Sequence, residues 1–69
     1  MAKYEIIIYW SYEDECFLGI VPELGELMAH GDTQEECLKE INIAISLWLE
    51  VAEEENMPIP VPKGKLMYA

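Results

Sequence analysis

The feature that most constrains the fold of this chain is the segment from residue 32 to residue 56, which has helical periodicity throughout. Thr33 is a natural N-cap residue, and Glu36 three positions later completes a capping box. No glycine or proline interrupts the run before Pro58. Its apolar residues recur at three- and four-residue spacing and share one stripe: Cys37, Leu38, Ile41, Ile45, Trp48, Leu49 and Ala52. The segment predicts one amphipathic helix, roughly 36 Å long, that lies across another layer of structure.

Much of the remaining chain has the composition of β-strands. Residues 3–10 are rich in aromatic and β-branched side chains and predict a strand, and residues 16–21 predict a second. Residues 27–30 predict a short third strand, and residues 65–69 a final edge strand. Gly19, inside the second strand, indicates a close approach by the helix. The expected fold is a two-layer α+β unit of order β-β-β-α-β, with one long helix on an antiparallel sheet.

The charge of the chain excludes several classes of partner. All fourteen acidic residues lie between Glu5 and Glu55, where Lys39 is the only lysine or arginine, so this span has a net charge of −13. A nucleic-acid backbone or an anionic membrane would be repelled by it. A basic protein partner remains compatible with the charge. With 69 residues the chain is expected to form one domain, and no signal peptide or transmembrane segment is visible.

No catalytic, cofactor or metal motif stands out, so the sequence does not predict an enzyme. His30 could be a general base or a metal ligand, but a polar residue at the end of a strand is the favoured interpretation. Cys37 with His30 could imitate a thiol–imidazole pair, yet Cys37 is expected to face the helix core. Residues 13–15 could attract a cation, but they lack calcium-loop spacing. Cys16 and Cys37 form no disulfide framework, which favours a cytoplasmic protein with reduced thiols.

Two sets of apolar residues exceed what one helix and one sheet can cover. A second helix ridge runs beside the main stripe: Ile43, Leu47 and Val51. By alternation, four further residues face away from the helix on the outer side of the sheet: Ile7, Tyr9, Leu18 and Ile20. Exposed apolar patches of this kind mark interfaces. We therefore expect these seven residues to lie in a partner or oligomer interface, with the chain at least a dimer.

The order of the motifs resembles that of the HicB-like antitoxin family. Residues 17–24 read FLGIVPEL, residues 30–38 read HGDTQEECL, and the end carries PIP and KGKLMY. The resemblance covers the whole chain and implies a partial RNase H-like fold. It also implies that the chain binds and neutralises HicA, a small basic toxin that cleaves messenger RNA. The family's Pro-Gly-Cys turn is replaced by Gly25-Glu26-Leu27. Because the chain stops at Ala69, the C-terminal DNA-binding domain of longer relatives, and with it promoter binding, is not expected.

Three functional hypotheses follow from these observations. The first is a non-enzymatic antitoxin-like protein that covers the RNA-binding face of a basic toxin. The second is a free-standing structural or regulatory oligomer without a toxin partner. The third is a degenerate nuclease, which would need a divalent metal on clustered carboxylates. The sequence shows no acidic pair or triad on matching strand positions, so the third hypothesis has the least support.

Overall fold

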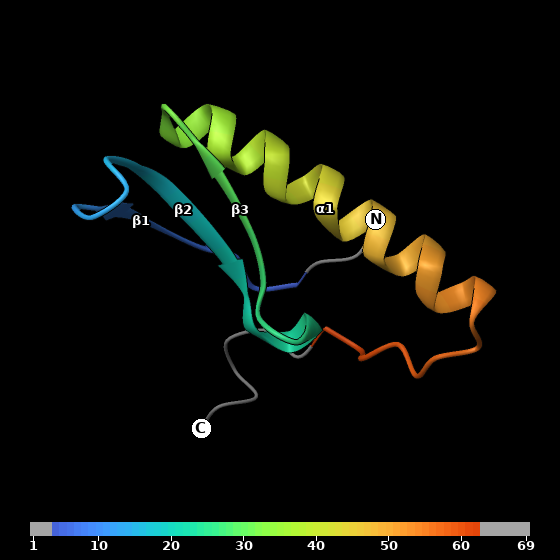
Figure 1. Cartoon of the computed structure of the whole chain (residues 1–69). Helices are drawn as coiled ribbons and strands as arrows, with labels where there is room; N and C mark the ends of the chain where they lie inside the picture. The colour runs from blue at the N-terminus through green and yellow to red at the C-terminus, as the bar shows by residue number, and fades with distance from the viewer. Residues whose placement is uncertain (1–3, 63–69) are drawn as a thin grey trace, which may run out of the picture.

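The computed structural model describes residues 4–62 and consists of a three-stranded sheet followed by one long helix (Figure 1). The elements are β1 (Ile7–Ser11), β2 (Cys16–Val21), the short 3-10 helix η1 (Pro22–Leu24), β3 (Leu27–Gly31) and α1 (Gln34–Glu54). The sheet is antiparallel with strand order β1-β2-β3, and α1 packs on one of its faces. The predicted α+β fold is confirmed. The predicted final strand at residues 65–69 lies outside the described residues.

The first strand begins four residues later than the sequence predicts, at Ile7, and ends at Ser11. Its register with β2 would place Glu5 opposite Pro22, which has no backbone N–H to donate, so the ladder cannot continue. The backbone N–H of Glu5 instead donates to Oε1 of Glu23, at 3.2 Å. The residue pattern predicted too long a strand, because the pattern of one strand does not show that Pro22 ends the pairing on the neighbouring strand.

The turn between β1 and β2 is fixed by its own side chains. The Ser11 hydroxyl donates to Oδ2 of Asp14 at 2.9 Å and accepts from the Asp14 backbone N–H at 3.2 Å. Glu15 closes the turn with a φ of 52°, in the left-handed region. Directly beside it, the Trp10 and Phe17 rings pack edge to face with centroids 5.1 Å apart. Local hydrogen bonds and one aromatic pair thus hold the hairpin in register.

The helix agrees with its predicted caps to within two residues. The Thr33 hydroxyl oxygen accepts from the backbone N–H of Glu36 at 3.1 Å, which satisfies one of the free donors of the first turn. At the other end, the Met57 N–H donates to the Ala52 carbonyl at 2.8 Å. Leu38, predicted to belong to the buried stripe, is exposed instead. It sits at the margin of the stripe, about 60° from Ile41 at 100° per residue, and the sheet does not reach it.

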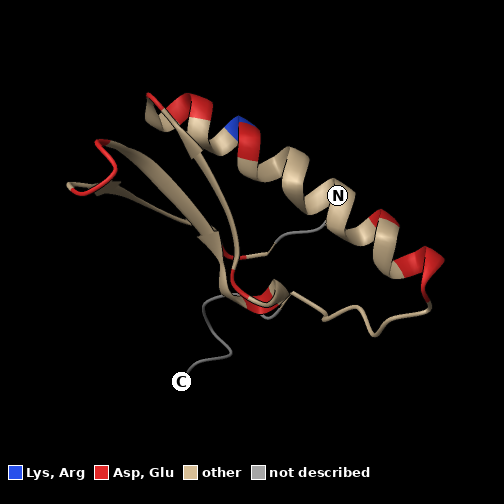
Figure 2. Ribbon diagram, viewed as in Figure 1, with Lys and Arg blue, Asp and Glu red and all other residues tan. Residues whose placement is uncertain are grey.

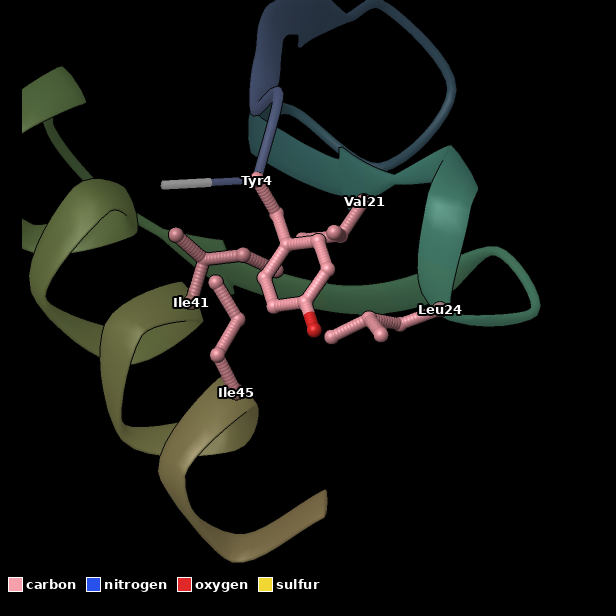
Figure 3. Close-up of a cluster of buried hydrophobic side chains, with 5 residues drawn as sticks. All are labelled: Tyr4, Val21, Leu24, Ile41 and Ile45. Atoms are coloured by element: carbon pink, nitrogen blue, oxygen red, sulfur yellow. The ribbon is translucent and has the colours of Figure 1, made fainter. Parts of the chain in front are cut away.

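A compact apolar core lies between α1 and the end of the sheet (Figure 3). The Tyr4 ring lies among the side chains of Ile41 and Ile45 from α1 and those of Val21 and Leu24. Its hydroxyl group donates to the backbone carbonyl of Pro60. This hydrogen bond satisfies the polar end of an otherwise buried ring. Tyr4 therefore connects the start of the described chain to the proline-rich segment that follows the helix.

Two glycines set the distance between the helix and the sheet. A Cβ atom added to Gly19 would lie 3.1 Å from Sγ of Cys37. A Cβ atom on Gly31 would lie 2.5 Å from the backbone nitrogen of Cys37 and 2.9 Å from its Cα. The predicted close approach at Gly19 is confirmed. The approach at Gly31 is tighter. A side chain is also harder to accommodate there, because the contact is with helix backbone, which cannot rotate away.

Replacing Gly31 by alanine should therefore force α1 away from β3. We expect Gly31→Ala to lower the free energy of unfolding by about 2 kcal/mol, measured by urea denaturation at neutral pH. Gly19→Ala should cost less, because the Cys37 thiol can adopt another rotamer. A Gly31→Ala variant as stable as the unmodified protein would contradict this account of the packing.

Candidate protein-binding surfaces

The four predicted residues of the outer sheet face come together in the structure. The sheet register pairs Ile7 with Ile20 and Tyr9 with Leu18, on the face away from α1. Ile7 and Tyr9 are each 45% exposed, whereas Leu18 and Ile20 are partly covered. None of the four carries a charge. The result is a continuous apolar patch across β1 and β2, which we call the outer face.

Two residues of β3 extend this patch and were not predicted as part of it. The register places Met28 opposite Ile20 and His30 opposite Leu18. Met28 is exposed, as are Ile7 and Tyr9. Alternation within the third predicted strand would have placed both residues there, once its pairing with β2 was known. The outer face, as used below, includes Met28 and His30.

The second predicted set forms an exposed ridge along α1. Ile43 is 45% exposed, Leu47 57% and Val51 51%. These side chains recur every four residues, so they form one row on the helix surface. The helix packs mainly on β3, less on β2 and least on β1. This offset leaves the ridge, defined as these three residues, beside the sheet rather than over it.

An open groove of about 500 Å³ runs between the β3 edge of the sheet and the helix. The β3 side contributes Ala29, His30 and Gly31. The remaining lining residues come from the turn and the helix: Asp32, Glu36, Glu40, Ile43, Ala44 and Leu47. The sequence did not predict this groove, because it depends on how far the helix is shifted toward the sheet edge. Two of the three ridge residues line it.

Negative charge is concentrated at four places on the fold (Figure 2). Acidic residues lie in the β1–β2 turn, in and after η1, in the first turns of α1 and around its C-terminal end. The middle of the helix carries few charges, and Lys39 is the only lysine or arginine among residues 4–62. Any protein that binds along α1 therefore meets a negative potential at both ends of an apolar stretch.

A smaller hollow of about 360 Å³ lies at the end of the outer face near the β1–β2 turn. Asp14, Cys16, Leu18, Met28 and His30 line it. Within residues 4–62, no three histidine, cysteine or acidic side chains are grouped as a metal site would require. The hollow brings an imidazole near a thiol on an exposed surface, but no hydrogen bond joins them among the contacts of the described residues.

The second thiol lies on the opposite face of the sheet from His30. Cys37 is completely buried beneath Gly19, and its thiol approaches the Ala29 carbonyl at 4.0 Å. Burial raises the pKa of Cys37 above the ordinary value for a thiol, and Cys16 adds to this effect. The thiol–imidazole pair considered from the sequence is thus not formed, and Cys37 acts as a small core residue.

No helix within residues 4–62 is long and apolar enough to cross a lipid bilayer.

The fold and its surfaces define a small α+β domain with exposed apolar patches flanked by acidic residues. The chain belongs to the UPF0150-like family, which matches residues 1–60. It is similar to a UPF0150 protein from Synechocystis sp., with 40% identity over 58 residues. That match covers 84% of this chain and 78% of the relative. No solved structure matches the chain.

The buried thiol predicts a specific dependence of stability on pH. Above the ordinary thiol pKa, ~8.5, Cys37 ionises in the unfolded chain while the folded thiol keeps its proton. The unfolded state then binds fewer protons, so the free energy of unfolding should fall as the pH rises through this range. Urea denaturation between pH 7 and 10 measures it. The fall should be smallest in Cys37→Ala, and Cys16→Ala should reduce it less, because that change removes only the smaller cause of the raised pKa. Equal pH profiles for the unmodified protein and Cys37→Ala would contradict the prediction.

Proposed function

We propose that this chain is a non-enzymatic, antitoxin-like protein that binds and neutralises a small basic HicA-type toxin. The HicB-like relationship and the partial RNase H-like description of the fold are part of this proposal. The observation that carries it is the arrangement of exposed apolar surfaces next to dense negative charge on one small domain. A toxin that cleaves messenger RNA needs a basic face for its substrate, and this surface has the complementary chemistry.

Neutralisation in this proposal is competition for the RNA-binding face. The net charge of −13 between Glu5 and Glu55 attracts a basic toxin toward this chain. In the complex, the same charge lowers the positive potential with which the toxin attracts RNA. Buried apolar contacts from the ridge or the outer face then slow dissociation. The chain needs no cofactor or catalytic residue for this role. The proposal places it in the cytoplasm, where the toxin meets messenger RNA.

Binding to the toxin should weaken strongly as salt is added. Exposed charges are screened beyond ~8 Å at physiological ionic strength, so steering contributes most at low salt. Isothermal titration of the chain against a HicA-type toxin encoded beside it measures the affinity at 20 mM and 300 mM salt. An RNA-cleavage assay with the same proteins should show loss of toxin activity at equimolar ratio. The chain alone should neither cleave RNA nor shift operator DNA. Absence of binding at low salt would overturn the proposal.

The second candidate function is a free-standing structural or regulatory oligomer. The specific observation in its favour is the largely apolar, half-exposed outer face, which could meet a second copy of itself around a two-fold axis. The two functions are compatible, because an antitoxin-like protein can also be a dimer. We propose at least a dimer, formed through the outer face or the ridge.

Charged substitutions should identify the surface that associates. If the outer face is the contact, Leu18→Glu should lower the mass measured by light scattering, whereas Leu47→Glu should leave it unchanged, and the reverse holds for the ridge. If the dimer still formed, the new glutamate would be buried in an apolar contact, and the free-energy cost of burying its charge would favour the monomer. Circular dichroism controls for folding. A monomeric unmodified protein at millimolar concentration would rule out both surfaces.

A further inference from the structure

The β3 strand forms one edge of the sheet, and the helix ridge lies beside that edge. The sheet order β1-β2-β3 leaves one side of β3 without a neighbouring strand within residues 4–62. An exposed sheet edge presents backbone N–H and C=O groups that can pair with a strand from another chain. The groove described above lies directly against this edge, because Ala29 and Gly31 line it together with Ile43 and Leu47.

A strand added to β3 would lie underneath the side of the helix that is now uncovered. Neighbouring strands are spaced about 4.8 Å apart, so a fourth strand extends the sheet by one such step past β3. The helix is already shifted toward this edge, since it packs mainly on β3. Alternate side chains of the added strand would point toward α1 and contact Ile43, Ala44 and Leu47. One occupant would thus pair the free edge and bury most of the ridge.

The chemistry of the groove changes along its length. At 100° per residue, Glu36, Glu40, Ile43 and Leu47 lie on one side of α1, with the acids toward its N-terminus. Asp32 adds a third carboxylate at the same end, next to the last residue of β3. The other end is lined by aliphatic side chains. A matching strand therefore has basic residues at one end and apolar residues at the other, on the side chains that face the helix.

The same charges argue against a second copy of this chain as the occupant. Two copies paired through β3 around a two-fold axis would run antiparallel, so Asp32, Glu36 and Glu40 of each copy would lie beside the Leu27 end of the other copy's β3. That strand contains no lysine or arginine, so the acids would gain no opposite charge there. The outer face carries no such charge and remains available for self-association. The groove and the outer face thus suit different partners.

We propose that the groove between β3 and α1 binds an extended strand of a basic partner protein, which joins the sheet at the β3 edge. Backbone hydrogen bonds to β3 supply part of the affinity, and the acidic-to-apolar gradient along α1 selects the sequence. The inference rests on the proposed function in one respect: it takes the basic partner to be the toxin. That the groove binds a strand with basic and apolar ends does not depend on the proposed function.

A designed peptide tests the strand chemistry without the toxin. The probe is a capped heptapeptide, Lys-Thr-Lys-Thr-Val-Thr-Val, whose first, third, fifth and seventh side chains face the helix when it pairs with β3. Its matched control replaces both lysines with glutamates. Amide NMR on the full chain at low salt should show shifts at residues 27–31 and 40–47 with the lysine peptide. The glutamate peptide should bind at least about fivefold more weakly, as expected for two lost charge contacts.

Substitutions in the groove have matched partners elsewhere on the helix. Glu36→Gln with Glu40→Gln should weaken the lysine peptide about fivefold, whereas Glu53→Gln with Glu54→Gln makes the same charge change outside the groove and should have little effect. Leu47→Ser should weaken binding, and Val51→Ser should not, because Val51 is equally exposed but does not line the groove. Leu47 and Val51 are both surface residues, so these variants should fold.

Three results would overturn the inference. The first is NMR shifts that map to the β1–β2 turn or to the C-terminal end of α1 instead of β3. The second is equal weakening by the groove and control variants. The third is concentration-dependent protection of the β3 amides without peptide, which would identify a second copy as the occupant. If the toxin fails to bind but the peptide result holds, the proposed function fails alone; if the toxin binds and the groove variants do not weaken it, the inference fails alone.

Discussion

The close approach of the helix to the sheet is the contact on which the rest of this structure depends. Gly19 and Gly31 let the first turns of α1 sit against β2 and β3, with the Cys37 thiol filling the space between. Because the helix is held at its N-terminal end near the β3 side, its direction across the sheet is set there. That direction places Ile41 and Ile45 over the core and leaves Ile43 and Leu47 beyond the sheet edge. Core and groove are two results of one packing constraint.

Most of the fold could be predicted because its signals are local. The Thr33 cap, the periodic stripe of α1 and the composition of β2 each specify their element without knowledge of distant residues. The first strand was placed too early because its start depends on Pro22, seventeen positions after Glu5, through the pairing register. Leu38 was misassigned for a similar reason: periodicity gives the side of a helix, but the width of the sheet decides how much of that side is buried.

The apolar surfaces were predictable in part. Of the seven surplus apolar residues named from the sequence, five are exposed and two, Leu18 and Ile20, are partly covered, and their role in an interface stays a prediction. Met28 and His30 were missed, since only the β2–β3 register adds them to the outer face. The groove could not be found from periodicity at all, because it is formed by Ala29 and Gly31 on one element and Leu47 on another. Such sites depend on tertiary geometry.

The contact between Tyr4 and Pro60 has a consequence for how the domain is made. The two residues are 56 positions apart, so the Tyr4 hydroxyl cannot reach its hydrogen-bond acceptor until Pro60 has left the ribosome. The hairpin and the helix can form earlier from local contacts, but closing this long loop comes last and is slowed by its entropy. The finished domain therefore appears only after Pro60 has emerged, and any binding activity that needs the completed core begins with that delay.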